Sequence, residues 1–406
     1  MPTTLRSALR NVRVLDGLGL RQERCTVLIE DGIIRACGPA RTTPVPRGFT
    51  ELDVHGLTVL PGLIDCHVHL CLGGEPDVVA TIEQDAPGLT LIKSLGYAKD
   101  TLAAGFTTVR DVGFRDHGVF ALKRAIDEGL VAGPRIVAAG LAICMTGGHA
   151  RFIGVEADGV DGVIAAVRAQ LAAGADVIKV IASGGVLTPG TSPDQAQFSV
   201  AELRAAVEEA GRAGRRVAAH AHGASGMKQA IAAGVHSIEH ATLMDAEAAA
   251  GMIEQGVFMV ATLSALATTA ACPLHGGVPA SAIGKAKQMR VRHEHSFQAA
   301  LKQGVRIAMG TDAGTPFNYH GENAQELDRM VTLGMSPMDA ITATTHSAAQ
   351  LLGLDESIGS IAVGKRADLL LVDGDPSRRI GILRDRDRLM GVMQNGRLVS
   401  GPLAQA

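Results

Sequence analysis

The sequence predicts an α/β fold, in which a (β/α)8 barrel of the TIM type is joined to a small β-sandwich domain formed from both termini. Two observations predict the architecture: short apolar runs alternate with Ala-rich stretches through the middle of the chain, while both ends contain β-type runs separated by tight turns. The 406 residues are 47% hydrophobic but only 3% aromatic, with no Trp. The core is therefore expected to be aliphatic, as in packed parallel strands and their covering helices.

The two ends of the chain are predicted to form one β domain. Asp16-Gly17, Asp31-Gly32 and Asn395-Gly396 lie between apolar runs, and such pairs are typical of hairpin turns. The runs themselves are 11–15, 25–30, 33–37, 367–373 and 391–399. We therefore predict a composite β-sandwich domain from residues 1–58 and 360–406, with the barrel at 59–359.

The barrel strands are expected at eight apolar runs: 62–68, 107–112, 135–139, 177–182, 216–220, 237–240, 258–262 and 306–311. Residues 200–213 and 224–233 have the composition of covering helices. Barrels of this type collect their reactive groups at the C-terminal ends of the strands. Polar residues at those ends are the first candidates for chemistry.

Charge and cysteine content exclude several classes of protein. The net charge is −3, and Lys and Arg are not gathered into a stripe, so we expect no nucleic-acid partner. Apolar runs are interrupted by Pro, Gly or charge, so we expect neither a signal peptide nor a membrane span. The six cysteines form no C-x-x-C pair, which is typical of reduced thiols and predicts a cytoplasmic protein.

Histidines at the strand ends suggest metal binding. His67 and His69 alternate along a strand, so both imidazoles face the same side and can hold one metal, although such a pair can also cap a loop. His220 and His240 each end an apolar run and add two further nitrogen donors suited to zinc. His222 repeats the alternate spacing, and we assign it to a second layer around the metal or to the substrate side.

Lys179 and Asp312 complete the candidate set. Lys179 interrupts a buried apolar strand, where a lone ammonium is costly. Either its head reaches an acid at the strand end, or its amine, with a pKa lowered by burial, reacts with carbon dioxide to give a bridging carboxylate. Asp312 closes the last strand, where a carboxylate can bind a metal and accept a proton from water. Its alternative role is to cap the next helix.

Together these residues resemble the amidohydrolase superfamily, within its imidazolonepropionase-like and prolidase-like branch. The motifs that carry the resemblance are Leu60-Pro-Gly-Leu-Ile-Asp-Cys-His-Val-His69, Thr107-Thr-Val-Arg-Asp-Val-Gly113, Thr146-Gly-Gly-His149, Ile178-Lys-Val-Ile-Ala-Ser-Gly-Gly185, His220-Ala-His-Gly223 and Ile238-Glu-His240. The resemblance implies two divalent ions, zinc being expected. It assigns His67, His69 and Asp312 to one ion, His220 and His240 to the other, and N6-carboxylated Lys179 as the bridge.

The resemblance also implies a reaction. The metal pair would activate a bridging hydroxide for attack on an amide carbonyl, with Asp312 moving the proton to the leaving nitrogen. His149 is expected to stabilise the oxyanion, unless it is a surface-loop residue. Arg151 and Arg110 are candidates for holding a substrate carboxylate, although Arg110 can instead form an ion pair with its neighbour Asp111.

The substrate is expected to be a small amide or dipeptide. Xaa-Pro dipeptides and N-acyl amino acids, including aryl amides similar to ochratoxin, come first. A cyclic amide hydrolase of the imidazolonepropionase type is the second hypothesis, and a non-catalytic metal-binding barrel is the alternative from another class. A homo-oligomer is implied by the resemblance only.

Overall fold

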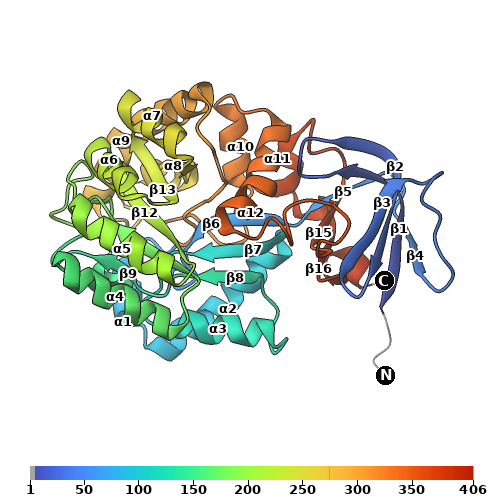
Figure 1. The fold of residues 1–406 in the computed structure, drawn as a ribbon, viewed down its shortest axis with the longest axis horizontal. Helices are drawn as coiled ribbons and strands as arrows, with labels where there is room; N and C mark the ends of the chain where they lie inside the picture. Colours follow the sequence, from blue (N-terminus) through green and yellow to red (C-terminus); the bar gives the residue numbers. More distant parts are fainter. Residues whose placement is uncertain (1–4, 274, 406) are drawn as a thin grey trace.

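The computed structural model describes residues 5–273 and 275–405 and has the predicted α/β class. One sheet is built from both chain ends, and two parallel sheets lie between them in sequence (Figure 1). The strands of the terminal sheet are β1 Arg6–Leu15, β2 Arg21–Glu30, β3 Ile33–Pro39, β4 Thr50–Asp53, β5 Leu57–Pro61, β15 Leu369–Asp373, β16 Leu389–Gln394 and β17 Arg397–Ser400.

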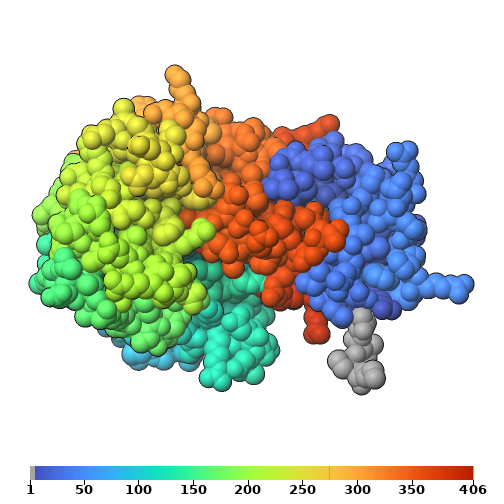
Figure 2. Space-filling model, viewed as in Figure 1, coloured from blue at the N-terminus to red at the C-terminus, as the bar shows by residue number. Residues whose placement is uncertain are grey.

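The terminal sheet joins the first and last parts of the chain. Its order is β17-β16-β15-β5-β1-β2-β3, and β15 pairs antiparallel with β5. Figures 1 and 2 show the early segments, in blue, beside the final ones, in red. At the turns Asp31-Gly32 and Asn395-Gly396 all four residues have φ between 49° and 78°, the backbone of a tight hairpin turn. These two predicted turns are therefore confirmed, and the third, Asp16-Gly17, lies in the connection between the antiparallel strands β1 and β2.

The parallel strands form a three-stranded and a six-stranded sheet, with orders β6-β7-β8 and β10-β9-β11-β12-β13-β14. Their bounds are β6 Leu63–Val68, β7 Phe106–Asp111, β8 Arg135–Ala138, β9 Ala142–Cys144, β10 Gly154–Glu156, β11 Val177–Ile181, β12 Arg216–Gly223, β13 Ser237–Leu243 and β14 Phe258–Val260. Every residue of β6, β7, β11 and β13 is buried. Such burial is typical of parallel strands, and it explains the apolar residues on both sides of Lys179 in β11.

The predicted strand 306–311 differs from the others. Only Ile307 forms a bridge, to Met259, so no strand is assigned along its length. Backbone bonds nevertheless place this segment between β14 and β6, because Met259 N–H donates to Arg306 O (2.8 Å) and Cys66 N–H donates to Met309 O (2.9 Å). Among the described residues the strand ladders remain two sheets and do not close into a ring.

Helices follow most of the parallel strands. They are α1 Val78–Gln84, α2 Pro87–Ala103, α3 Gly118–Asp127, α4 Gly159–Ala173, α5 Val200–Arg212, α6 Ala224–Ala233, α7 Ala246–Gln255, α8 Leu263–Ala271, α9 Ala280–Gln303, α10 Gln325–Thr332, α11 Pro337–Ala343 and α12 His346–Leu352. The helices predicted at 200–213 and 224–233 are confirmed as α5 and α6. α5 begins at a capping box in which Ser199 and Glu202 satisfy each other's backbone N–H groups. In the described part of the chain, no helix is both long enough and apolar enough to cross a bilayer.

Candidate metal centre

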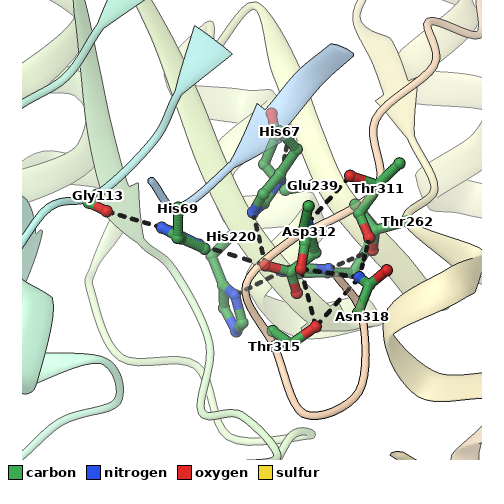
Figure 3. Close-up of polar contacts among 12 residues, drawn as sticks. His67, His69, Gly113, His220, Glu239, Thr262, Thr311, Asp312, Thr315 and Asn318 are labelled. Carbon is green, nitrogen blue, oxygen red and sulfur yellow. Dashed lines mark hydrogen bonds and ion pairs between the residues drawn. The ribbon is translucent and has the colours of Figure 1, made fainter. Parts of the chain in front are cut away.

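His67, His69 and Asp312 form one group of possible metal ligands. His67 lies in β6, His69 follows it, and Asp312 follows the segment that lies beside β6 (Figure 3). Nε2 of His67 and Nε2 of His69 lie 3.5 and 3.3 Å from Oδ1 of Asp312. The alternate spacing along β6 therefore places both rings against one carboxylate, as predicted from the sequence.

The other nitrogen of each ring is already bonded. Nδ1 of His67 lies 2.8 Å from Oε2 of Glu239, and Nδ1 of His69 lies 2.8 Å from the carbonyl oxygen of Gly113. In each case Nδ1–H donates, so Nε2, which faces Asp312, is the nitrogen left to bind a metal. Metal-binding histidines are usually oriented in this way.

His220, His222 and His240 form a second group at the ends of β12 and β13. Nε2 of His240 lies 2.9 Å from Nδ1 of His220. Threonine hydroxyls contact Nδ1 of two of these rings. The Thr262 hydroxyl lies 2.7 Å from Nδ1 of His240, and the Thr242 hydroxyl lies 2.7 Å from Nδ1 of His222. The sequence alone kept His222 apart from the other two, whereas the structure brings all three rings together.

Lys179 lines the same cavity as both of these groups. Its side chain is 2% exposed, and Nζ has no hydrogen-bond partner among the described residues. Burial lowers the pKa of this amine to about 8. An unpartnered buried amine next to five imidazoles and a carboxylate fits the expected lysine-bridged metal pair better than it fits a structural lysine.

Burial also keeps most of the imidazoles neutral. It lowers the pKa of His67 to about 4, and those of His220, His222 and His240 well below the ordinary value. At His69 burial acts in the same direction, but the hydrogen bond and charge of Asp312 outweigh it and raise the pKa. Neutral imidazole is the form that binds metals.

Several residues at the site have an unusual backbone. His240, Thr262 and Asp312 adopt φ values of 71°, 54° and 60°. Non-glycine residues rarely occupy this left-handed region, and such positions concentrate at functional sites. Side-chain bonds hold the Asp312 turn in place: Nδ2 of Asn318 donates to the Asp312 carbonyl at 2.9 Å, and the Thr315 hydroxyl donates to the same oxygen at 2.8 Å (Figure 3).

An apolar cavity opens beside the two groups. It encloses about 700 Å³, including open solvent, and its apolar walls are formed by Leu72, Val112, Ala142, Ala150, Phe152, Ile153, Ile181, Val186, Leu187, Ala265 and Leu266. His149 lies in the same wall, buried, with Nδ1 2.8 Å from the Thr188 hydroxyl. His149 is therefore not a surface-loop residue.

The two arginine candidates do not reach this cavity. Arg110 is 1% exposed, and its guanidinium contacts Glu239 at 2.9 Å, the Ser237 hydroxyl at 3.1 Å and the Cys66 carbonyl at 2.5 Å. Its ion-pair partner is thus Glu239 and not the neighbouring Asp111. Arg151 is exposed and does not line the cavity. Neither guanidinium lines the cavity in this structure, and their role in holding a substrate carboxylate stays a prediction.

Glu239 is the site residue that sequence reasoning missed. It is fully buried and joins Arg110 to His67, which explains how a charged arginine is tolerated inside the sheet. The available signal was an acid inside the predicted strand 237–240, next to the candidate ligand His240.

The fold and these side chains define the class of protein: a hydrolase whose candidate metal-binding groups gather at the ends of parallel strands. The chain belongs to the amidohydrolase family, whose model matches residues 58–399. It therefore hydrolyses amide or peptide bonds, and the resemblance predicted from the sequence motifs is confirmed.

Individual relatives support this assignment. Ochratoxinase from Aspergillus niger is 33% identical over 95% of this chain and 85% of its own. A crystal structure of a Xaa-Pro dipeptidase with methionine bound in its active site is 36% identical and covers 98% of this chain and all of its own, with a TM-score of 0.90. A prolidase complexed with N-methylphosphonate-L-proline is 33% identical over 97% of this chain and 99% of its own, with a TM-score of 0.91.

Proposed function

We propose that the protein is a binuclear amidohydrolase that releases an amino acid from a dipeptide of the Xaa-Pro type or from an N-acyl amino acid. The observation that carries this proposal is the buried, unpartnered amine of Lys179 in a cavity lined by both groups of candidate ligands. His67, His69 and Asp312 would hold one divalent ion, and His220 and His240 the other, zinc being the first expectation. His222 belongs to the same group as His220 and His240 and would be a further nitrogen donor.

Lys179 is proposed to act as a carbamate. Its neutral amine would add to carbon dioxide, forming an N–C bond and releasing one proton, and the resulting carboxylate would satisfy the two ions at once. The lowered pKa makes the neutral amine accessible. Metal-loaded crystals grown with bicarbonate are expected to show this group on Nζ, and density that ends at a bare amine would contradict it.

The chain's own residues would then move the protons. Bound ions would supply Lewis acidity, both to an attacking water and to the substrate carbonyl. Asp312 would accept the proton of the water and return it to the leaving nitrogen, because an amide anion is a poor leaving group.

His149 would stabilise the developing oxyanion through Nε2–H. The Thr188 hydroxyl accepts the N–H of Ala150 at 3.3 Å, so its own hydrogen is available to Nδ1 of His149. In this tautomer the hydrogen of the ring is on Nε2, the nitrogen that can donate to substrate.

The cavity favours a substrate with an apolar group. Phe152, Leu187 and Leu266 form walls that suit an aromatic or branched side chain. This lining supports N-acyl amino acids and aryl amides, and it does not favour the small polar ring of an imidazolonepropionase substrate.

The architecture around the site is proposed to be a complete (β/α)8 barrel at 59–359, with a β-sandwich from 1–58 and 360–406. Support comes from the bonds that place segment 306–311 between β14 and β6, and from Asp176 N–H, which donates to Ala138 O across the gap between β8 and β11 (2.8 Å). A reducing, cytoplasmic location is proposed because no cysteine of the described residues is paired.

The test is hydrolysis of a small panel by zinc-loaded protein: Xaa-Pro dipeptides, N-acyl amino acids with aliphatic or aromatic acyl groups, and each compound with its carboxylate amidated. Release of the amino acid from the apolar members is expected. Metal-loaded protein that cleaves none of them would favour a non-catalytic metal-binding barrel. Equal rates for amidated compounds would show that no carboxylate is recognised.

A further inference from the structure

A long loop between β11 and α5 covers one side of the cavity. We call residues 183–197 the 183–197 loop. Its two ends are tied together, since Ser183 and Ala196 form a β-bridge and Gly184 N–H donates to Gln195 O at 2.9 Å. Between these ties, Val186 and Leu187 contribute to the cavity wall.

The same loop contacts both ring nitrogens of His149. The Thr188 hydroxyl lies 2.8 Å from Nδ1. Gly185 lies against the other side of the ring, so closely that a Cβ atom on this residue would overlap Nε2. The orientation of His149 therefore depends on where the backbone of residues 185–188 sits.

That backbone is held by a lysine from another element. Nζ of Lys285, in α9, donates to the carbonyl oxygens of Gly185 (3.0 Å), Thr188 (3.2 Å) and Thr191 (2.8 Å). An ammonium has three N–H donors, and all three are used here. Lys285 does not line the cavity, so its ammonium is not placed to contact substrate.

We propose that Lys285 is a positioning residue that fixes the 183–197 loop, and through Gly185 and Thr188 sets the orientation of His149. It also fixes the wall made by Val186 and Leu187, so the loop determines how large an apolar group the cavity accepts. We call the three hydrogen bonds from Lys285 to the loop the Lys285 clamp. The effect on catalysis rests on the proposed role of His149 in amide hydrolysis, whereas the clamp itself does not.

The clamp is tested without activity by hydrogen–deuterium exchange on the zinc-loaded protein. Lys285→Met removes all three donors but keeps the aliphatic stem, and it is expected to speed amide exchange within residues 185–192 at least tenfold. Lys287→Met, two residues along the same helix at an exposed position, is the matched control and is expected to leave exchange unchanged. Unchanged exchange in Lys285→Met would overturn the clamp.

The link to His149 is tested by a double-mutant cycle in kcat. Lys285→Met and Thr188→Val are each expected to lower kcat roughly 10- to 100-fold, since small displacements of a catalytic group have effects of this size. If both act through His149, the double variant should be little worse than the poorer single variant, which is non-additive coupling. Effects that multiply would overturn the positioning role.

A second variant, Gly185→Ala, and a comparison of KM values test the same contacts independently. Gly185→Ala leaves Lys285 intact but displaces the His149 ring, so it is expected to lower kcat even if Lys285→Met folds poorly; normal turnover in Gly185→Ala would overturn the contact. Lys285→Met should also raise KM more for bulky aryl amides than for small acyl amides. If no panel compound is cleaved, the proposed function fails, whereas the exchange experiment still tests the clamp.

Discussion

Asp312 receives contacts from both histidines of the first group, and its own backbone is fixed by Asn318 and Thr315. Asp312→Asn keeps an oxygen that can bind a metal but removes the group that accepts a proton. We expect kcat to fall by roughly 10²- to 10⁴-fold, the range typical of a lost general base, while metal content measured by atomic absorption stays near the wild-type value. Near-normal turnover would remove Asp312 from this role.

Glu239 is expected to be the most sensitive buried charge. Glu239→Gln leaves the Arg110 guanidinium without a counter-ion inside the sheet, which typically costs roughly 3–5 kcal/mol. The free energy of unfolding from urea titration measures this loss. Glu247→Gln is the matched control, because Glu247 pairs with Lys228 at an exposed site and such pairs contribute little. Similar losses in both variants would contradict the account.

At the residue scale the sequence predicts which side chains come together better than it predicts where long charged side chains point. Alternation along β6 was enough to bring His67 and His69 together, because side-chain direction in a strand follows from spacing. The partner of Arg110 was predicted wrongly, because its ion pair is with Glu239 and not with Asp111. Which way an arginine points depends on partners from distant strands, such as Glu239, and one sequence does not show those pairs.

Among the elements, α8 depends on a buried acid from α10. The Glu326 carboxylate accepts the N–H of Leu263 and of Ser264, both at 2.7 Å, at the start of α8. The preceding residue is Thr262, which bonds His240, and α8 itself supplies Leu266 to the cavity. Glu326 therefore supports both the second ligand group and the apolar wall.

This carboxylate predicts a pH dependence of stability. Burial raises the pKa of Glu326 from 4.5 to about 7. Because the folded state holds the proton more tightly than the unfolded state, the resulting stabilisation is present below about pH 4.5 and is lost as the pH rises through about 7. Glu326→Gln cannot titrate. Raising the pH from 5 to 8 is thus expected to lower the Tm of the wild type relative to the variant, and a constant difference would contradict this.

Elements with strong periodicity were predicted well, and those fixed by tertiary contacts were not. α5 and α6 agree with expectation within a residue, since caps and Ala-rich composition act locally. The short strands β9 and β10 were missed because three residues carry no pattern. Segment 306–311 was predicted as a strand, but bonds to two neighbours hold it with little regular pairing.

At the scale of the whole molecule, segments far apart in the sequence form one sheet and one candidate site. β5 pairs with β15, more than 300 residues later, so the terminal sheet exists only when both ends are present. The candidate centre is likewise built from strands that span residues 63–243 together with Asp312. Hairpin signals predicted the first feature and strand-end histidines the second, whereas the bonds of segment 306–311 to β14 and β6 depend on long-range contacts that no local pattern encodes.

The central claim is that the two ligand groups and Lys179 hold two metal ions. The most direct measurement is the number of zinc ions bound per chain after reconstitution with zinc and bicarbonate and removal of loose metal. We expect two zinc ions per chain for the wild type and a clear loss in Lys179→Ala. Protein that binds one ion or none, or a Lys179→Ala variant that still binds two, would contradict it.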